Sequence, residues 1–454
     1  MTARRPRIFL GTTEIAGFYG TLAAALRELG YDARFVDFAP HPFGYAKPAT
    51  RVPWFIGATV ALRTRLARMA RGTRLQRLKA RAMEWLERAI LALLVVPWAL
   101  LRFDVFCFGF LTSLVGPGRD YWDIALLRRA GKRILCFLHG GDSRPPYMTG
   151  PFVRMTRKDA ARWPANLAEL TRERRRTMDR LETLADVMVD GPARGHFHRR
   201  PYVAFPRVGI PAPDVQPAAV RSPRSGERQR LLVLHAPSER AAKGSDVIAA
   251  CMARLAREGH PFDYVELSGV RHEQVLERLA DCDFVVDQLY SDTPMAGLAT
   301  EAALFGKPAV VCGYFQEREW LDGVPSCYVH PDQLESAVRR MIVDRPHRED
   351  LGKRAREFVA SQRDARQVAR KVLRVIAGDI PADWWIDPRG CRYLYGTGQS
   401  EAELRAALAE LIAACGPGAL ALDDKPGLRD ALVALGRTGG LREEQRPRSV
   451  AHGG

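Results

Sequence analysis

The chain has 454 residues, of which 47% are apolar and 27% charged, and 69 basic side chains against 52 acidic ones give a net charge of +17. This length is about three times that of a ~150-residue domain, so two large domains are expected. The composition excludes a disordered, collagen-like or disulfide-framework chain. The charge indicates an anionic partner and leaves phosphorylated ligands, an acidic membrane and nucleic acid open.

The cysteine pattern and the apolar runs bear on location. The eight cysteines include no Cys-x-x-Cys pair and several lie in apolar runs, which is typical of buried side chains in a reducing compartment. The apolar stretch at residues 8–10 is too short for a signal peptide. The longest apolar run, residues 90–101, contains Pro97 and falls short of the roughly twenty residues that span a bilayer. We therefore expect a cytoplasmic protein.

The first forty residues predict a strand, a loop, a helix and a second strand. Residues 7–10 are mostly apolar, Gly11 and Gly17 bound the loop, leucines recur at helical spacing over residues 22–29, and residues 35–38 form the next apolar run. Such a unit opens a doubly wound α/β domain, in which ligands bind at the carboxyl ends of the parallel strands. Functional residues are therefore expected in the loops that follow strands.

A basic helical insertion is predicted at about residues 51–101. Between Arg63 and Arg88 it carries nine basic residues against two acidic ones, with a partial apolar stripe. One interpretation places it on an acidic membrane, where each cation contributes about 1 kcal/mol and a lipid-linked acceptor is within reach. The alternative is a solvated helix face followed by a buried core helix.

Strand and helix patterns then divide the rest of the chain. The N-terminal domain is expected over residues 1–212, and residues 213–230, rich in Pro, Ser and Arg, are interpreted as a linker. A second strand–helix alternation predicts another domain over residues 231–380. Residues 381–454 are expected to form a C-terminal helical extension with a disordered end. The predicted fold class is α/β, with two Rossmann-like domains facing across a cleft.

A phosphate site is predicted where residues 235–246 join a strand to a helix. Backbone amides at a helix N-terminus favour an anion, and Arg240 and Lys243 add positive charge. The alternative is an ordinary turn whose lysine covers the surface. Further along, residues 287–308 combine a strand end, a glycine-bearing loop and a helix in which Glu301 is followed by Ala-Ala-Leu-Phe-Gly-Lys-Pro.

Together these two segments resemble the donor-binding half of the GT-B fold glycosyltransferases, family 4 and its relatives. The resemblance implies that Lys243 and Arg240 hold a nucleotide diphosphate and that Glu301 binds the ribose hydroxyls. A carboxylate can accept hydrogen bonds from two neighbouring hydroxyl groups, which suits this role. The backbone amides of Ala296, Gly297 and Leu298 are expected to bind the distal phosphate.

The first domain resembles one bacterial branch of the same group, in residues 104–106, 123–132 and 139–144. The resemblance implies that His139, after a strand, contacts the donor sugar, and Asp142 is the second candidate catalytic residue. A loop-capping role is the alternative for His139. The loop between Gly11 and Gly17 matches the glycine loop that passes close to donor and acceptor.

One position departs from the family pattern. Many retaining members have another glutamate eight residues before the one that corresponds to Glu301. Here Thr293 occupies that position, with Asp292 beside it. The sugar-side carboxylate is therefore missing or shifted. A GT-B-like scaffold that binds nucleotide without turnover is the alternative to an enzyme.

The resemblance implies a hexosyltransferase-type enzyme that moves a sugar from a nucleotide diphosphate sugar to a hydroxyl acceptor. Retention, and a place in bacterial surface-glycan or secondary-metabolite assembly, are also implied. No metal or cofactor is expected, because His196 and His198 lack zinc-type partners and no Asp-x-Asp site is evident. No recognition motif supports nucleic acid as a partner. A peripheral position on the inner face of the plasma membrane is one alternative for the location.

Overall fold

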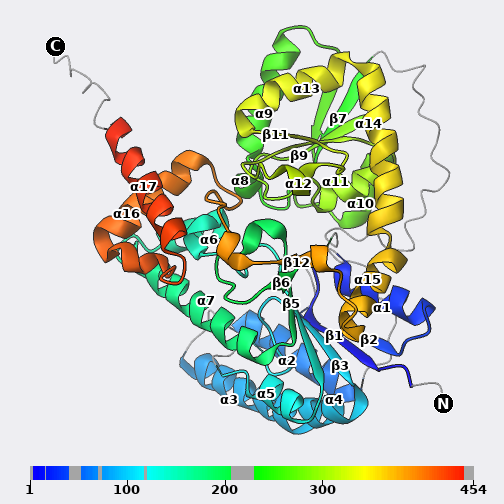
Figure 1. The fold of residues 1–454 in the computed structure, drawn as a ribbon, viewed down its shortest axis with the longest axis vertical. Helices are drawn as coiled ribbons and strands as arrows, with labels where there is room; N and C mark the ends of the chain where they lie inside the picture. Colours follow the sequence, from blue (N-terminus) through cyan, green and yellow to red (C-terminus); the bar gives the residue numbers. More distant parts are fainter. Residues whose placement is uncertain are drawn as a thin grey trace.

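The computed structural model describes residues 4–15, 17–39, 53–69, 74–116, 120–205 and 230–443. They form two α/β domains, one above the other in Figure 1, each built on a sheet of mainly parallel strands. The predicted linker, apart from Arg230, and the chain end from residue 444 lie outside the described residues.

The sheet of the first domain has the strand order β12-β6-β5-β4-β3-β1-β2. Its strands are β1 (Ile8–Thr13), β2 (Ala33–Ala39), β3 (Val105–Gly109), β4 (Arg133–Phe137), β5 (Val187–Val189), β6 (Tyr202–Val203) and β12 (Trp385–Ile386). Neighbouring strands are parallel except β12, which runs antiparallel to β6. Strands β1, β3, β4 and β5 are almost wholly buried, as parallel strands covered by helices on both faces must be.

Helices cover both faces of this sheet. On one face α1 (Phe18–Glu28) shares a core with α15 (Ala365–Ala377). The other face packs against α5 (Trp122–Arg129), α7 (Ala165–Leu184) and the C-terminal helices. A short helix, α6 (Gly150–Arg157), and two helical turns, η2 (Pro146–Met148) and η3 (Pro192–Arg194), follow strands β4 and β5. The alternation of strand and helix predicted for this domain is confirmed.

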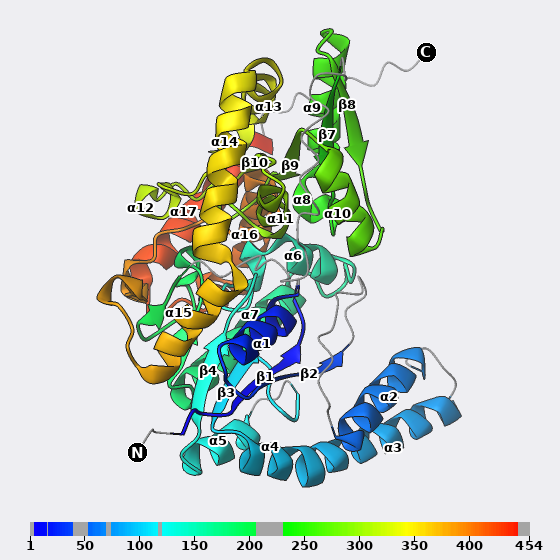
Figure 2. The ribbon, with the colours of Figure 1, turned by 90° about the vertical axis from the view of Figure 1, so that its right-hand side faces the viewer.

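The basic insertion consists of two long helical segments, α2 (Trp54–Met69) and a run of α3 (Arg74–Ile90), the π-helical turn η1 (Leu91–Val95) and α4 (Val96–Arg102). Figure 2 shows this run along the lower end of the first domain, with α2 beside it. The side chains of residues 67–81 lie outside the described part of the chain. Within the residues described, no helix is both long and apolar enough to cross a membrane.

The second sheet has the order β11-β10-β9-β7-β8 and is parallel throughout. Its strands are β7 (Leu231–His235), β8 (Phe262–Glu266), β9 (Phe284–Gln288), β10 (Ala309–Cys312) and β11 (Cys327–Val329). Its helices are α8 (Arg240–Lys243), α9 (Ser245–Arg257), α10 (His272–Asp281), α11 (Gly297–Leu304), α12 (Arg318–Leu321), α13 (Leu334–Val343) and α14 (Arg345–Phe358), with the helical turn η4 at Pro331–Gln333. Helices α9, α10, α11, α13 and α14 bury apolar side chains against the two faces of the sheet.

Each sheet has a point where the direction of strand addition reverses. In the first sheet β1 lies between β2 and β3, and in the second β7 lies between β8 and β9. In open α/β sheets ligands bind outside the carboxyl ends of the strands at such a switch point. The loops after β7 and β9 are the two that carry the predicted donor motifs.

The chain returns to the first domain through α15, which packs against α1 after the π-helical turn η5 (Val359–Arg363). Residues 365–377, which the sequence placed in the second domain, thus contribute to the core of the first. The extension continues through η6 (Ala382–Trp384), η7 (Pro388–Gly390), α16 (Glu401–Cys415), η8 (Pro417–Leu420) and α17 (Pro426–Glu443). Its buried leucines join the core of the first domain, so the extension is part of that domain's packing.

Residues 391–400, here named the interdomain strap, run between the two domains. Thr397 donates its backbone N–H to Met148 and accepts one from Gly150, both in the first domain, at 3.0 Å each. Its hydroxyl donates to the carbonyl of Tyr290 in the second domain at 2.8 Å, and the N–H of Gly398 donates to the same carbonyl at 3.0 Å. The strap therefore ties α6 to the end of β9.

The two domains, their facing strand ends and the returning α15 make up the GT-B architecture, so the predicted fold is confirmed. All eight cysteines are free of disulfide bonds, and five of them are buried. Cys327 and Cys391 are only partly buried and Cys415 is exposed, so these three depart from the expectation that the cysteines are core side chains.

Gly396 tests the packing of the strap. Its φ is +69°, and a Cβ there would lie 1.8 Å from the carbonyl oxygen of Met148. Gly131 has a similar φ of +72° but open space around it. We expect Gly131→Ala to lower the free energy of unfolding by about 1 kcal/mol, and Gly396→Ala by about 1–3 kcal/mol more, in urea denaturation. Equal losses in the two variants would contradict the close contact between the strap and η2.

Candidate active site

Lys243 lies at the carboxyl edge of the second sheet, at the end of the short helix α8. Its ammonium group donates a short hydrogen bond to Gln288 and lies 3.7 Å from the carboxylate of Asp287, both at the end of β9. Gly244 follows with a φ of +71°, and a Cβ there would lie 2.7 Å from the side chain of Leu289. Glycine at 244 therefore lets residues 240–244, here named the lysine loop, approach β9 closely.

The lysine loop is held in place from the side of the sheet by His235, the last residue of β7. Its buried ring donates from Nδ1 to the carbonyl of Val286 at 2.7 Å, and its Nε2 accepts from the hydroxyl of Ser245 at 2.8 Å. Burial lowers the pKa of His235, which keeps the ring neutral. His235 thus connects β7, β9 and the start of α9.

Arg240 extends the positive charge of this loop. Its guanidinium forms ion pairs with Glu266, at the end of β8, and with Asp246 at 2.7 Å. Arg240 is half-exposed, so these pairs exchange with water and with competing anions at little cost.

The loop after β9 leads into the N-terminus of α11. Ala296 is the N-cap residue, and no side chain caps the helix, so the amides of Gly297 and Leu298 point outward from the first turn. One turn later, Glu301 accepts a hydrogen bond of 2.7 Å from the ring of His272, the first residue of α10. That bond raises the pKa of His272. The structure thus brings the lysine loop, the helix amides and Glu301 to one edge of one sheet.

The sequence analysis did not single out His272, because no residue near Glu301 in the sequence indicates a histidine partner. It lies 29 positions before Glu301 and fixes one carboxylate oxygen of that residue. Binding of ribose hydroxyls by this carboxylate stays a prediction.

His139 lies after β4 in the first domain, in an aromatic environment. Its Nε2 is 2.9 Å from the hydroxyl of Tyr19, and its ring packs on Phe18, Tyr19 and Phe110 at centroid distances of 5.0–5.8 Å. The side chain is only 6% exposed. A role in contacting a donor sugar stays a prediction for this histidine.

Asp142 turns back toward its own loop. One carboxylate oxygen accepts the N–H of His139 at 2.9 Å, and the other lies 3.4 Å from the guanidinium of Arg174. Burial raises the pKa of Asp142 to about 6. These contacts give Asp142 a positioning role for the His139 loop, and its catalytic role stays a prediction.

The predicted glycine loop differs in part from the expectation. Gly11 lies inside β1, where a Cβ would approach the carbonyl oxygen of Val36 to 2.5 Å, so strand packing requires this glycine. Gly17 is the N-cap of α1 with a φ of +73°. Between them, the buried carboxylate of Glu14 accepts the N–H groups of Ile15, Tyr19 and Gly20 at 2.8–3.0 Å. The amides at this helix N-terminus thus bind the protein's own carboxylate, which the sequence reasoning missed.

Asp292 precedes Thr293, the position that departs from the family pattern, and it faces the first domain. It pairs with Arg194 at 2.8 Å and with Arg144 at 3.1 Å. Arg194 also lies 3.6 Å from Asp190, whose carboxylate accepts hydrogen bonds from Ser143 and His198. We name Arg144, Asp190, Arg194 and Asp292 the interdomain ion cluster. Asp292 therefore does not replace the missing sugar-side carboxylate, because both of its oxygens are engaged by buried guanidinium groups.

A cavity of about 110 Å³ lies beside the interdomain ion cluster, between the two domains. Aromatic and aliphatic side chains form most of its wall, together with Thr293 and Arg363; they include Phe205, Phe315, Trp320, Val324 and Phe358. Neither Lys243 nor Glu301 lines it. This cavity is thus separate from the donor residues predicted from the sequence.

The two histidines at 196 and 198 are buried and bonded within the protein. His196 donates a hydrogen bond of 2.8 Å from Nε2 to the carbonyl of Tyr393 in the strap, and His198 lies between Glu182 and Asp190. In the parts of the chain that the structure describes, no cluster of His, Cys, Asp and Glu could hold a metal ion.

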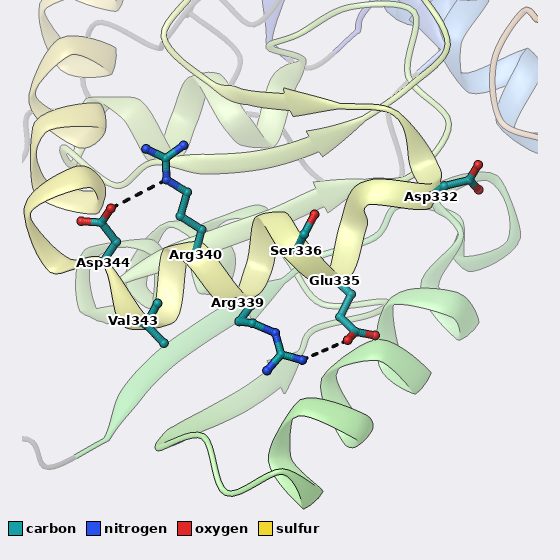
Figure 3. A pocket seen from close by; sticks show the side chains of 7 residues that line it. All are labelled: Asp332, Glu335, Ser336, Arg339, Arg340, Val343 and Asp344. Carbon is teal, nitrogen blue, oxygen red and sulfur yellow. Dashed lines mark hydrogen bonds and ion pairs between the residues drawn. The ribbon is translucent and has the colours of Figure 1, made fainter.

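An open hollow of about 600 Å³ lies on α13, at the end of the second domain far from the first (Figures 1 and 3). Most of its lining residues are charged, and Figure 3 shows Arg339 paired with Glu335 and Arg340 with Asp344. Both arginines of the lining are thus paired with acidic neighbours, and Asp332 is the remaining charged residue.

No protein-family model matches the chain, and no curated protein is similar in sequence. Among solved structures, sucrose-phosphate synthase from Thermosynechococcus elongatus is 14% identical, with 83% of this chain and 99% of that chain covered and a TM-score of 0.46. HepE from Anabaena in complex with UDP and glucose is 12% identical, with 82% and 100% covered and a TM-score of 0.46. The catalytic domain of starch synthase IV from Arabidopsis thaliana, bound to ADP and acarbose, is 11% identical, with 83% and 99% covered and a TM-score of 0.47. With similarities this low, the function has to be argued from the residues of the site.

Asp292→Asn tests the interdomain ion cluster. Arg144 and Arg194 would remain buried without their shared anion, so we expect a loss of about 3–5 kcal/mol in the free energy of unfolding. The exposed pair of Arg230 and Asp263 provides the control, since Asp263→Asn should cost less than about 1 kcal/mol. Equal costs in urea denaturation would contradict a buried cluster.

The same cluster predicts a pH dependence. Burial acts to raise the pKa of Asp292, but the two guanidinium groups outweigh it and lower the pKa to about 2, from an ordinary value of 3.8. The stabilisation is therefore complete above the ordinary value and lost as the pH falls through the folded one. The stability difference between wild type and Asp292→Asn should shrink between about pH 5 and about pH 2, and a constant difference would contradict the pairing.

Proposed function

We propose that the protein is a glycosyltransferase that moves a sugar from a nucleotide diphosphate sugar to a hydroxyl group. The observation that carries the proposal is the grouping of Lys243, Arg240, the open N-terminus of α11 and Glu301 at the switch point of the second sheet. Cations and helix amides bind a diphosphate, and a carboxylate oriented by His272 binds ribose hydroxyls. These groups do so without requiring a resident metal ion.

In the proposed reaction the bond between the anomeric carbon and the diphosphate oxygen breaks, and the diphosphate leaves with the electron pair. The acceptor oxygen forms the new bond to the anomeric carbon, and its proton passes to the leaving diphosphate. Lys243 and the amides of Gly297 and Leu298 stabilise the negative charge that develops on the leaving group. In the GT4-like, hexosyltransferase-type reaction proposed here, the donor sugar faces His139 and the product retains the anomeric configuration.

The proposal requires Lys243 and Arg240 to exchange partners. Lys243 is bonded to Gln288, and Arg240 is paired with Glu266 and Asp246. A diphosphate carries more charge than any of these groups, so it competes for both side chains when it binds. The acceptor is proposed to belong to surface-glycan or secondary-metabolite assembly, and a lipid-borne hydroxyl is the alternative favoured by the exposed apolar side chains of the basic insertion.

The second candidate is a nucleotide-binding scaffold without turnover. It is favoured by Thr293 at the motif position and by the engagement of Asp292 in the interdomain ion cluster. Incubation with UDP-, GDP-, ADP- and TDP-sugars separates the two. Release of nucleoside diphosphate supports the enzyme, and binding seen as a raised Tm without release supports the scaffold.

Substitutions at Lys243 and Glu301 test the nucleotide site. Each side chain is expected to make a charged hydrogen bond to the nucleotide, so Lys243→Met and Glu301→Gln should weaken binding of the cognate nucleoside diphosphate at least about tenfold in calorimetry. The exposed residues Lys353 and Glu357 provide matched controls, as Lys353→Met and Glu357→Gln. Unchanged affinity in the first two variants would refute the assignment.

A further inference from the structure

The helix from Arg74 to Arg102 is apolar on two opposite faces. Leu91, Val95 and Ala99, spaced by four residues, are buried against the first domain. Leu86, Leu93, Pro97 and Leu101 are all exposed, so they lie on another side of this helical run. That second face is exposed: Leu93 is 72% and Leu101 77% accessible.

Two tryptophans of the same insertion are also exposed. Trp85 in α3 and Trp54 at the start of α2 are 72% and 75% exposed. Half of the large apolar side chains that are exposed in the described part of the chain belong to this one insertion, namely Trp54, Trp85, Leu86, Leu93, Leu94 and Leu101. Such a concentration of exposed apolar side chains in one insertion is typical of an interaction surface.

The sequence around these side chains is strongly basic. Residues 63–88 carry nine basic residues against Glu84 and Glu87, and Glu87 is paired with Arg63. A second copy of the chain would bring the same positive charge to the contact, which disfavours self-association. Nucleic acid would match the charge but offers no apolar interior for leucine and tryptophan. A bilayer with acidic lipids satisfies both requirements, because its headgroups are anionic and its interface accepts tryptophan.

We infer that the α2–α4 insertion docks the protein on an anionic membrane surface. The exposed side chains of Leu86, Leu93, Leu101 and Trp85 enter the headgroup–acyl boundary, and the net positive charge of the insertion attracts the lipid phosphates. The helix lies in the plane of the surface, because its apolar stretch is too short to span the bilayer. The inference rests on the surface alone and stands apart from the proposed transfer reaction.

The test is sedimentation of the full chain with phosphatidylcholine vesicles, with or without about one third phosphatidylglycerol. We expect binding to the anionic vesicles, weak binding to the neutral ones, and weakening as salt rises. The triple variant Leu86→Ser, Leu93→Ser, Leu101→Ser should bind at least about tenfold more weakly. A control triple, Val247→Ser, Val343→Ser, Trp385→Ser, replaces exposed apolar side chains elsewhere and should bind like wild type.

Because all the substituted side chains are exposed, both triple variants should keep the wild-type Tm and nucleotide affinity. Failure of the wild type to bind anionic vesicles, or equal binding by the two triple variants, would overturn the inference. Self-association of the wild type that is lost in the first triple, without vesicle binding, would overturn it in favour of an interface between copies. Binding of duplex DNA in place of vesicles would overturn it in favour of nucleic acid.

Discussion

The contact of Asp292 with Arg144 and Arg194 fixes how the two domains face each other. The arginines follow strands β4 and β5 of the first sheet, and the aspartate follows β9 of the second. Arg144 is fully buried and Asp292 nearly so, so neither side can turn to water without leaving an uncompensated charge inside the protein. The carboxyl ends of both sheets are thereby held toward the same interface.

The strap and α15 reinforce this arrangement from the C-terminal side. Thr397 joins α6 to the carbonyl of Tyr290, only two residues from Asp292. Arg154 of α6 bonds to Gly398 and pairs with Glu239 just before the lysine loop. The lysine loop is thus positioned by contacts with the end of β9 and with the first domain across the interface. These contacts order the loop before a ligand binds.

Local patterns predicted the strands and helices because each pattern reports which face of an element is buried. Lys243 and Glu301 were singled out by a resemblance to a family motif in two short segments, and their binding roles stay predictions. Residues whose partners are distant in the sequence were missed. Asp292 meets Arg144 across 148 positions, His272 meets Glu301 across 29, and β12 joins the first sheet through two residues. Gly11 was placed in a loop because its sequence does not reveal the carbonyl of Val36 that crowds it.

The central claim is that a nucleoside diphosphate binds at the switch point of the second sheet. A crystal structure with the cognate nucleoside diphosphate tests it most directly. The account predicts phosphate oxygens against Lys243 and the amides of Gly297 and Leu298, with the ribose at Glu301. A nucleotide bound elsewhere, with Lys243 still bonded to Gln288 and Glu301 contacting only His272, would contradict it.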